Sequence, residues 1–129
     1  MSKVVTRTER GWPAHFIGAA NCFFRRNTLL ECGEERIVVS TVGSYRPSRE
    51  ELITEIGAFG RYYETMVFAA QKDGPYWDAN VSDQKYFDSP WQISAESPEL
   101  LPDDVDNRAN DMHEAVVSEF TNKMAEEVK

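Results

Sequence analysis

The sequence has no long hydrophobic run and few cysteines. No apolar stretch approaches the roughly 18 residues of a membrane-spanning helix, so we expect no membrane partner. The opening residues, MSKVVTRTERGWP, lack the apolar core and cleavage site of a secretory signal. Two cysteines, Cys22 and Cys32, provide no disulfide framework. We therefore expect reduced thiols in a cytoplasmic protein.

Motifs of known chemistry are also missing. There is no G-x-S-x-G, no phosphate-binding Walker loop and no G-x-G-x-x-G. The two histidines, His15 and His113, and the two cysteines lack ligand spacings such as C-x₂-C or H-x₃-H, so we expect no metal site and no cofactor. Cys22 with His15 as its base is an alternative, but a free cysteine is commonly a small buried hydrophobe.

Positive charge is scarce in the second half of the chain. The net charge is −8. Residues 1–49 hold eight basic and four acidic residues, a net charge of +4, whereas residues 50–129 hold six basic and eighteen acidic residues, a net charge of −12. Binding to duplex DNA draws most of its affinity from phosphate neutralisation. We therefore expect no direct binding of duplex nucleic acid.

What is present indicates one folded domain over residues 1–129. The chain is 41% apolar and carries fifteen aromatic residues, unlike disordered sequences. Residues 28–32 and 36–42 read as two strands joined by a turn at 33–35, because β-branched residues flank a glycine-containing break. In the second strand Ile37, Val39 and Thr41 share one face and Val38 and Val42 the other, which indicates a central strand.

The remaining segments are less regular until the C-terminus. Residues 16–17 and 22–24 suggest a further, broken strand, residues 49–56 a short helix, and residues 61–70 a strand. Residues 76–88 and 89–94 read as loop or short edge strands, and residues 95–106 as a surface connection.

A long helix closes the chain. From about Asn107 to Glu127, apolar residues recur at helical spacing and include Phe120, with Asp106 as the predicted cap. His113 lies on this stripe, where we expect a packed neutral imidazole. Strands followed by a closing helix predict an α+β fold, with an antiparallel sheet packed against the C-terminal helix.

Two surfaces are candidates for function. The first is an anion site formed by His15, Arg25 and Arg26, since the arginine fork binds carboxylate or phosphate oxygens in pairs. Neighbouring side chains on a regular strand point to opposite faces, so both arginines reach one ligand only if the strand bends there. The alternative is that both arginines pair with the acidic half of the chain.

The second candidate is an interface rich in aromatic and acidic residues. It comprises Tyr76, Trp77, Asp78, Asp83 and Asp88. Aromatic residues are enriched in interface hot spots, and acidic residues select a basic partner and speed its approach. The competing interpretation places some of these aromatic side chains in the core.

Two stretches of the sequence carry a resemblance. GWPAHFIGAANCFFRRNTLLECGEERIVVSTVG (residues 11–43) and RYYETMVF (residues 61–68) resemble short uncharacterised proteins of phages and mobile elements. The resemblance implies a protein that binds and modulates host or element machinery, such as an inhibitor. The leading hypothesis is thus an acidic protein that binds a protein partner, with carboxylates placed where nucleic-acid phosphates would lie. The alternative is a small enzyme or sensor for an anionic ligand.

Overall fold

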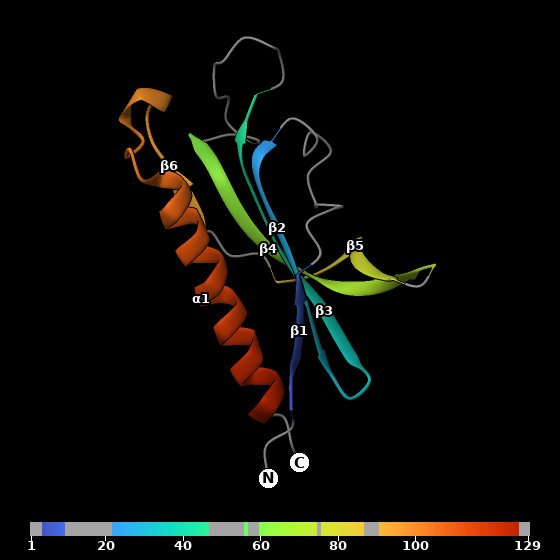
Figure 1. Ribbon diagram of the computed structural model, residues 1–129. Coiled ribbons are helices and arrows are strands. Elements are labelled where there is room, and N and C mark those ends of the chain that lie inside the picture. Colours follow the sequence, from blue (N-terminus) through green and yellow to red (C-terminus); the bar gives the residue numbers. More distant parts are fainter. Residues whose placement is uncertain are drawn as a thin grey trace.

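The described residues form six strands and one long helix. The computed structural model describes residues 4–9, 22–46, 56, 60–74, 76–86 and 91–126 (Figure 1). The elements are β1 (Thr6–Glu9), β2 (Cys22–Cys32), β3 (Glu35–Tyr45), β4 (Arg61–Asp73), β5 (Tyr76–Tyr86), β6 (Gln92–Ser94), the 3₁₀ turn η2 (Pro98–Leu100) and the helix α1 (Val105–Glu126). The predicted α+β fold, with an antiparallel sheet against a C-terminal helix, is confirmed.

The sheet is an antiparallel meander. Its strand order is β1-β2-β3-β4-β5, and β6 pairs with β4 beside this path. The hairpin between β2 and β3 closes with Cys32 opposite Glu35, so its loop is Gly33-Glu34. Gly33 has φ of 62°, a left-handed conformation that glycine adopts without strain. The predicted hairpin is confirmed, with Glu35 in the strand rather than in the turn.

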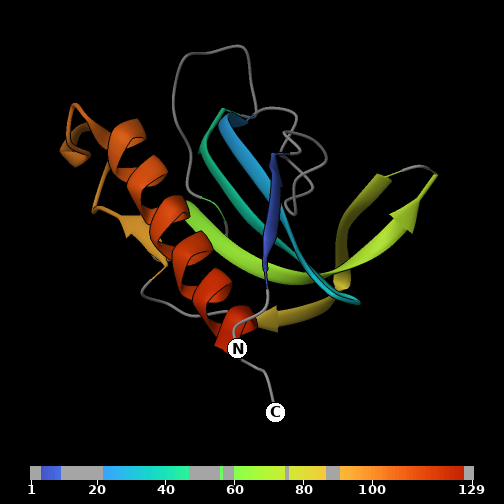
Figure 2. The same ribbon diagram turned by 60° about the horizontal axis from the view of Figure 1, so that its bottom comes forward.

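β4 has different partners along its length. Residues 61–64 pair with β6, whereas residues 67–73 pair with β5. The pairing with β5 contains register shifts around Phe68, and such bulges bend a strand. Figure 2 shows β4 curving, so that its end and the start of β5 project away from α1. Residues 76–86 form the edge strand β5, so the expected edge position is confirmed, whereas the expectation of a loop or of short strands is wrong, because β5 is eleven residues long.

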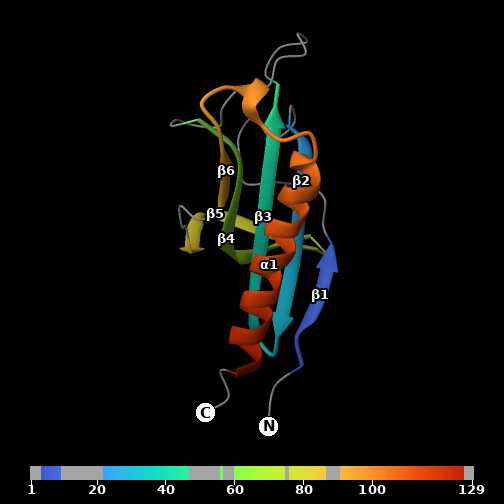
Figure 3. The same cartoon turned by 90° about the vertical axis from the view of Figure 1, so that its left-hand side faces the viewer.

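The helix covers one face of the sheet (Figure 3). The ring of Phe120 is 2% exposed and meets Trp91 edge-to-face, with 5.7 Å between ring centroids. The core on this face comprises Leu30, Cys32, Ile37, Val39, Val67, Val116, Val117, Phe120 and Met124. The apolar stripe predicted for the helix is confirmed as its buried side.

The opposite face of the sheet has its own apolar cluster. It comprises Leu29, Val38, Phe68 and Ala79, with Trp77 packed against them. Val38 and Val39 are 1% and 0% exposed on opposite faces of β3. The interpretation of β3 as a central strand is confirmed, because apolar residues cover both of its faces.

Three local expectations need correction or lie outside the described residues. Residues 22–24 are not part of a separate strand, because β2 runs unbroken from Cys22. Asp106 lies in the first turn of α1 rather than at its cap, and it accepts a hydrogen bond of 2.6 Å from the Tyr63 hydroxyl. Residues 16–17 and the proposed helix at 49–56 lie outside the described residues, except Ile56.

Candidate functional site

Four polar side chains are buried between the sheet and α1. Thr28, Thr41 and Thr65 come from β2, β3 and β4, and His113 comes from α1; each is 0% exposed. The imidazole Nε2 lies 2.7 Å from Thr28 Oγ1, and Nδ1 lies 2.7 Å from Thr41 Oγ1. Thr41 Oγ1 lies 2.6 Å from Thr65 Oγ1. The packed histidine predicted from the sequence is confirmed, and both ring nitrogens have partners.

Each hydroxyl group has one proton, and this fixes which atom donates in every hydrogen bond of this network. Thr28 donates its one proton to Glu9 Oε2 at 2.7 Å, so it accepts a hydrogen bond from His113 Nε2. A neutral imidazole has one N–H, so Nδ1 is an acceptor and Thr41 donates to it. Thr65 then donates to Thr41. The direction is thus Thr65 to Thr41 to His113 to Thr28 to Glu9, with His113 in the Nε2–H tautomer.

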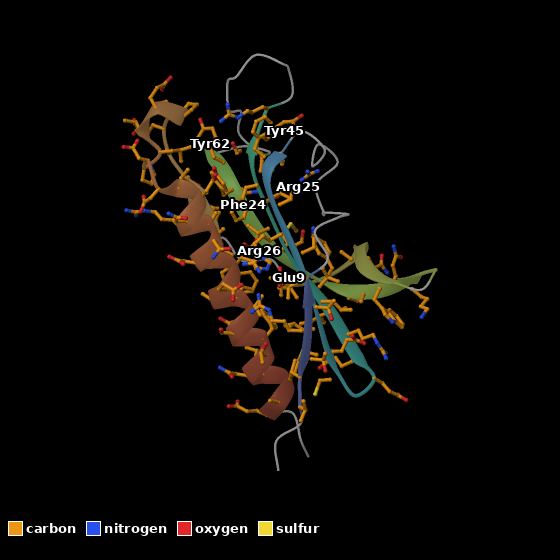
Figure 4. All side chains as sticks on the ribbon, in the orientation of Figure 1. Glu9, Phe24, Arg25, Arg26, Tyr45 and Tyr62 are labelled. Atoms are coloured by element: carbon orange, nitrogen blue, oxygen red, sulfur yellow. The ribbon has the colours of Figure 1, made fainter. Side chains whose placement is uncertain are left out.

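An ion-pair cluster lies at the Glu9 end of this hydrogen-bond network (Figure 4). Arg26 on β2 donates to Glu9 Oε1 at 2.6 Å and to Glu114 Oε2 at 2.6 Å. Arg7 on β1 binds both carboxylate oxygens of Glu114, at 2.8 and 2.6 Å. Two arginines from the sheet thus hold one carboxylate from the sheet and one from the helix.

The surroundings shift the pKa values of these groups. Hydrogen bonds from Arg7 and then Arg26 lower the pKa of Glu114 to about 2. Burial alone would raise the pKa of Glu9, but hydrogen bonds from Arg26, Thr28 and Arg7 outweigh it and lower the pKa. Burial, followed by the positive charge of Arg26, lowers the pKa of His113 to about 4. At neutral pH the cluster therefore holds two carboxylates, two guanidinium groups and a neutral imidazole.

This arrangement suits attachment of the helix rather than catalysis. A general base must lie within hydrogen-bond reach of its substrate, whereas His113 is 0% exposed. Its two nitrogens are engaged with threonine hydroxyls. The network therefore connects α1 to β1, β2, β3 and β4. The side of α1 that faces away from the sheet takes no part in it.

The predicted anion site is only partly described. His15 lies outside the described residues. Arg26 faces α1 and its guanidinium binds carboxylates, as the pairing alternative expected. Arg25 is exposed, and because the pairing of β2 with β3 continues without a bend at this point, its side chain points to the opposite face. The structure therefore separates Arg25 from Arg26.

The predicted aromatic and acidic interface belongs largely to β5. Tyr76, Trp77, Asp78 and Asp83 are on this strand, and Asp88 lies outside the described residues. Trp77 is half-buried, and its ring packs under two cations: Arg36 Cζ lies 4.5 Å and Lys72 Nζ 5.1 Å from the ring centroid. Trp77 thus serves in part as core, as the competing interpretation expected.

Acidic side chains gather elsewhere, on α1 and the segment before it. Residues 91–126 contain nine acidic and two basic residues, a net charge of −7. We call the exposed acids of this segment the acidic surface: Glu96, Glu99, Asp103, Asp104, Asp106, Asp111, Glu119 and Glu126. Its two basic residues pair within it, Arg108 with Asp104 at 2.9 Å and Lys123 with Glu119 at 3.1 Å.

Comparisons with known protein families, with curated proteins and with solved structures found no match for this chain.

Neither cysteine offers a reactive site. Both thiols are free and buried, Cys22 and Cys32 at opposite ends of β2. Ten residues of extended strand separate their Cα atoms by roughly 33 Å, far beyond disulfide reach. Burial raises the pKa of Cys22 to about 11, which suppresses the thiolate. Among the described residues, no group of three or more potential ligands is arranged for a metal ion, and no helix has the length and apolar content to cross a membrane.

Sequence reasoning missed Glu9, Glu114 and the three threonines. A signal was present for the threonines: Thr41 follows Ile37 and Val39 at every second position of β3, so a hydroxyl interrupts an apolar face. A buried hydroxyl needs a partner, and that requirement points to a polar residue on the covering helix. The charged partners were not predictable. Glu9 lies 17 positions before Arg26 and Glu114 lies 88 positions after it, so no local pattern connects these residues.

Proposed function

We propose that this protein is a binding module that engages a basic protein partner through the acidic surface. The observation that carries the proposal is the acidic surface of residues 91–126, whose eight exposed acids and two basic residues give a net charge of −6 in a molecule of net charge −8. Eight of the nine acids in this segment are exposed. Clustered carboxylates attract cationic partners and raise association rates by long-range steering.

The ion-pair cluster supports this assignment. The cations nearest to the inner side of α1, Arg7 and Arg26, have their charge balanced by Glu9 and Glu114. They therefore do little to reduce the negative field outside α1. A partner with a basic groove for nucleic acid would meet carboxylates where it normally binds phosphates. The resemblance to phage and mobile-element proteins favours an inhibitory role toward such a partner.

The anion-site alternative has weaker support. Arg26 is 20% exposed at its side chain, and its two terminal nitrogens bind carboxylates. Another anion would have to displace Glu9 or Glu114 from short charge-assisted bonds. Titration with inorganic phosphate tests this alternative directly, and saturable binding that His15→Ala and Arg25→Ala abolish would favour it over the acidic surface.

The experiment compares two charge-reversed variants against one partner. The partner is isolated by affinity capture with the wild-type protein, purified, and its association rate is measured from 50 to 500 mM salt. Asp103→Lys with Asp111→Lys reverses two exposed acids of the acidic surface. Glu34→Lys with Glu35→Lys is the control, since it makes the same change in net charge at two exposed residues, one in the β2–β3 turn and one at the start of β3.

We expect the association rate to fall with salt, because exposed charges are screened over about 8–10 Å. The Asp103 and Asp111 variant should associate at least about tenfold more slowly than the control variant. A third variant, with Asp78, Asp83 and Asp88 changed to Lys, shows whether the aromatic and acidic interface predicted from the sequence contributes. An association rate that does not depend on salt and is equal in all variants would refute the proposal.

A further inference from the structure

A groove runs between β1 and the second half of α1. Its volume is about 340 Å³, and it is partly open to solvent. Figure 1 shows β1 alongside this part of the helix. We call it the β1–α1 groove; it is lined by Val5, Arg7, Val117, Ser118, Thr121 and Asn122. A site for a small molecule encloses most of its ligand, whereas this groove is open and suits a chain that passes along it.

The strand beside the groove lies at the edge of the sheet. Among the described strands, β1 pairs only with β2. Alternate backbone N–H and C=O groups of an edge strand point away from its neighbour and can pair with another chain. All four residues of β1 are exposed. Arg7 faces α1 and lines the groove, so a strand added beyond β1 would have one set of side chains next to α1.

The charges around the groove indicate what kind of segment fits. The only cation among its lining residues is Arg7, whose guanidinium binds both oxygens of Glu114. The helix that forms the other wall carries five acidic and two basic residues, a net charge of −3. The lining itself combines two valines with hydroxyl and amide groups, which suits small side chains rather than large aromatic ones.

We propose that an extended basic segment of the partner adds as a strand to the outer edge of β1 and places alternate side chains in the β1–α1 groove. The proposal rests on the proposed function for its choice of a basic protein partner. Main-chain bonds to β1 would supply affinity, and the groove would select small side chains at every second position. Lysine or arginine residues flanking these positions would meet the carboxylates of α1.

The test uses a phage-displayed library of random peptides as the probe, followed by synthesis of the selected peptides. Affinity is measured by fluorescence polarisation on the full chain. Ser118→Phe places a ring in the groove. Ala115→Phe is the matched control, because Ala115 is also an exposed residue of α1 but does not line the groove. Thermal unfolding of both variants verifies that they fold.

Two results are expected. Selected peptides should be basic and should bind Ser118→Phe at least tenfold more weakly than Ala115→Phe. N-methylation at successive backbone positions of a selected peptide should weaken binding at every second position, because only alternate N–H groups of an added strand face β1. Peptides that bind both variants equally, an N-methylation profile without this period, or a library that yields no binder would overturn the proposal.

Two further outcomes separate this proposal from the proposed function. If Ser118→Phe leaves association with the purified partner unchanged while Asp103→Lys with Asp111→Lys slows it, the groove is refuted and the acidic surface stands. If wild type sediments as a dimer and Ser118→Phe as a monomer, a second copy of this chain occupies the edge of β1. That result also overturns the assignment to a basic partner segment.

Discussion

The buried histidine makes a quantitative prediction about stability and pH. In the folded protein the pKa of His113 is about 4, below its ordinary value of 6.5. The unfolded chain therefore binds this proton more readily, and stability falls as pH drops below 6.5 until it levels off near 4. A difference of about 2.5 pKa units corresponds to roughly 3 kcal/mol in total. Between pH 7 and pH 5 the expected loss is about 2 kcal/mol.

This window separates the histidine from the carboxylates. Glu9 and Glu114 have lowered pKa values, so the stability they contribute is present above about 4.5 and is lost as pH falls below it. A decline between pH 6.5 and pH 4.5 is thus assigned to histidine. His15 is the other histidine, and His15→Gln provides a background in which His113 alone titrates.

The assay is urea unfolding at several pH values, followed by tryptophan fluorescence and extrapolated to zero denaturant. In the His15→Gln background the free energy of unfolding should fall by about 2 kcal/mol from pH 7 to pH 5. Adding His113→Gln should lower stability at pH 7, because buried threonine hydroxyls lose a partner, and should remove the decline above pH 4.5. A decline that persists in the double variant would refute the assignment.

Four further predictions concern the packing of the core. Phe120→Ala should lower the free energy of unfolding by about 3–5 kcal/mol in urea titrations, since the ring is 2% exposed. Removal of residues from Asn107 onward should expose the sheet and cause aggregation in sedimentation runs. A truncated protein that stays monomeric would contradict the packed helix. Gly43→Ala should cost about 1–3 kcal/mol, because a Cβ there overlaps the ring of Tyr63; a melting temperature equal to wild type would exclude this contact. Thiol titration without reductant should detect two thiols after unfolding and slow reaction before it, since Cys22 and Cys32 are buried; two fast-reacting thiols in the folded protein would contradict that burial.

The predictable elements are those whose apolar residues recur at a regular spacing. The helix α1 and the strand β3 carry apolar residues at their characteristic spacings, so their type and buried faces follow from the sequence. β5 was not predictable in this way, because Asp78, Asn80 and Asp83 are poor strand formers. Its strand conformation comes from pairing with the long strand β4, which is a tertiary effect.

The polar network was hidden for a different reason. Its bonds join residues far apart in sequence: Arg7 and Glu114 are separated by 107 positions, and Thr28 and His113 by 85. Local periodicity carries no information at such separations. The sequence did suggest that Arg25 and Arg26 pair with second-half carboxylates, and the contact of Arg26 with Glu114 is of this kind.

The network also explains why the acidic surface has a fixed orientation. A helix held by apolar contacts alone can shift by one residue, which rotates each side chain by about 100° around the axis. Such a shift would leave His113 and Glu114 without their partners on the sheet, and an unpaired buried polar group is costly. The hydroxyls of Thr28 and Thr41 and the guanidinium groups of Arg7 and Arg26 therefore select one rotation of α1. In that rotation Asp111 and Glu119 are exposed to solvent and Val117 and Ser118 line the groove, so the buried polar contacts determine which residues a partner meets.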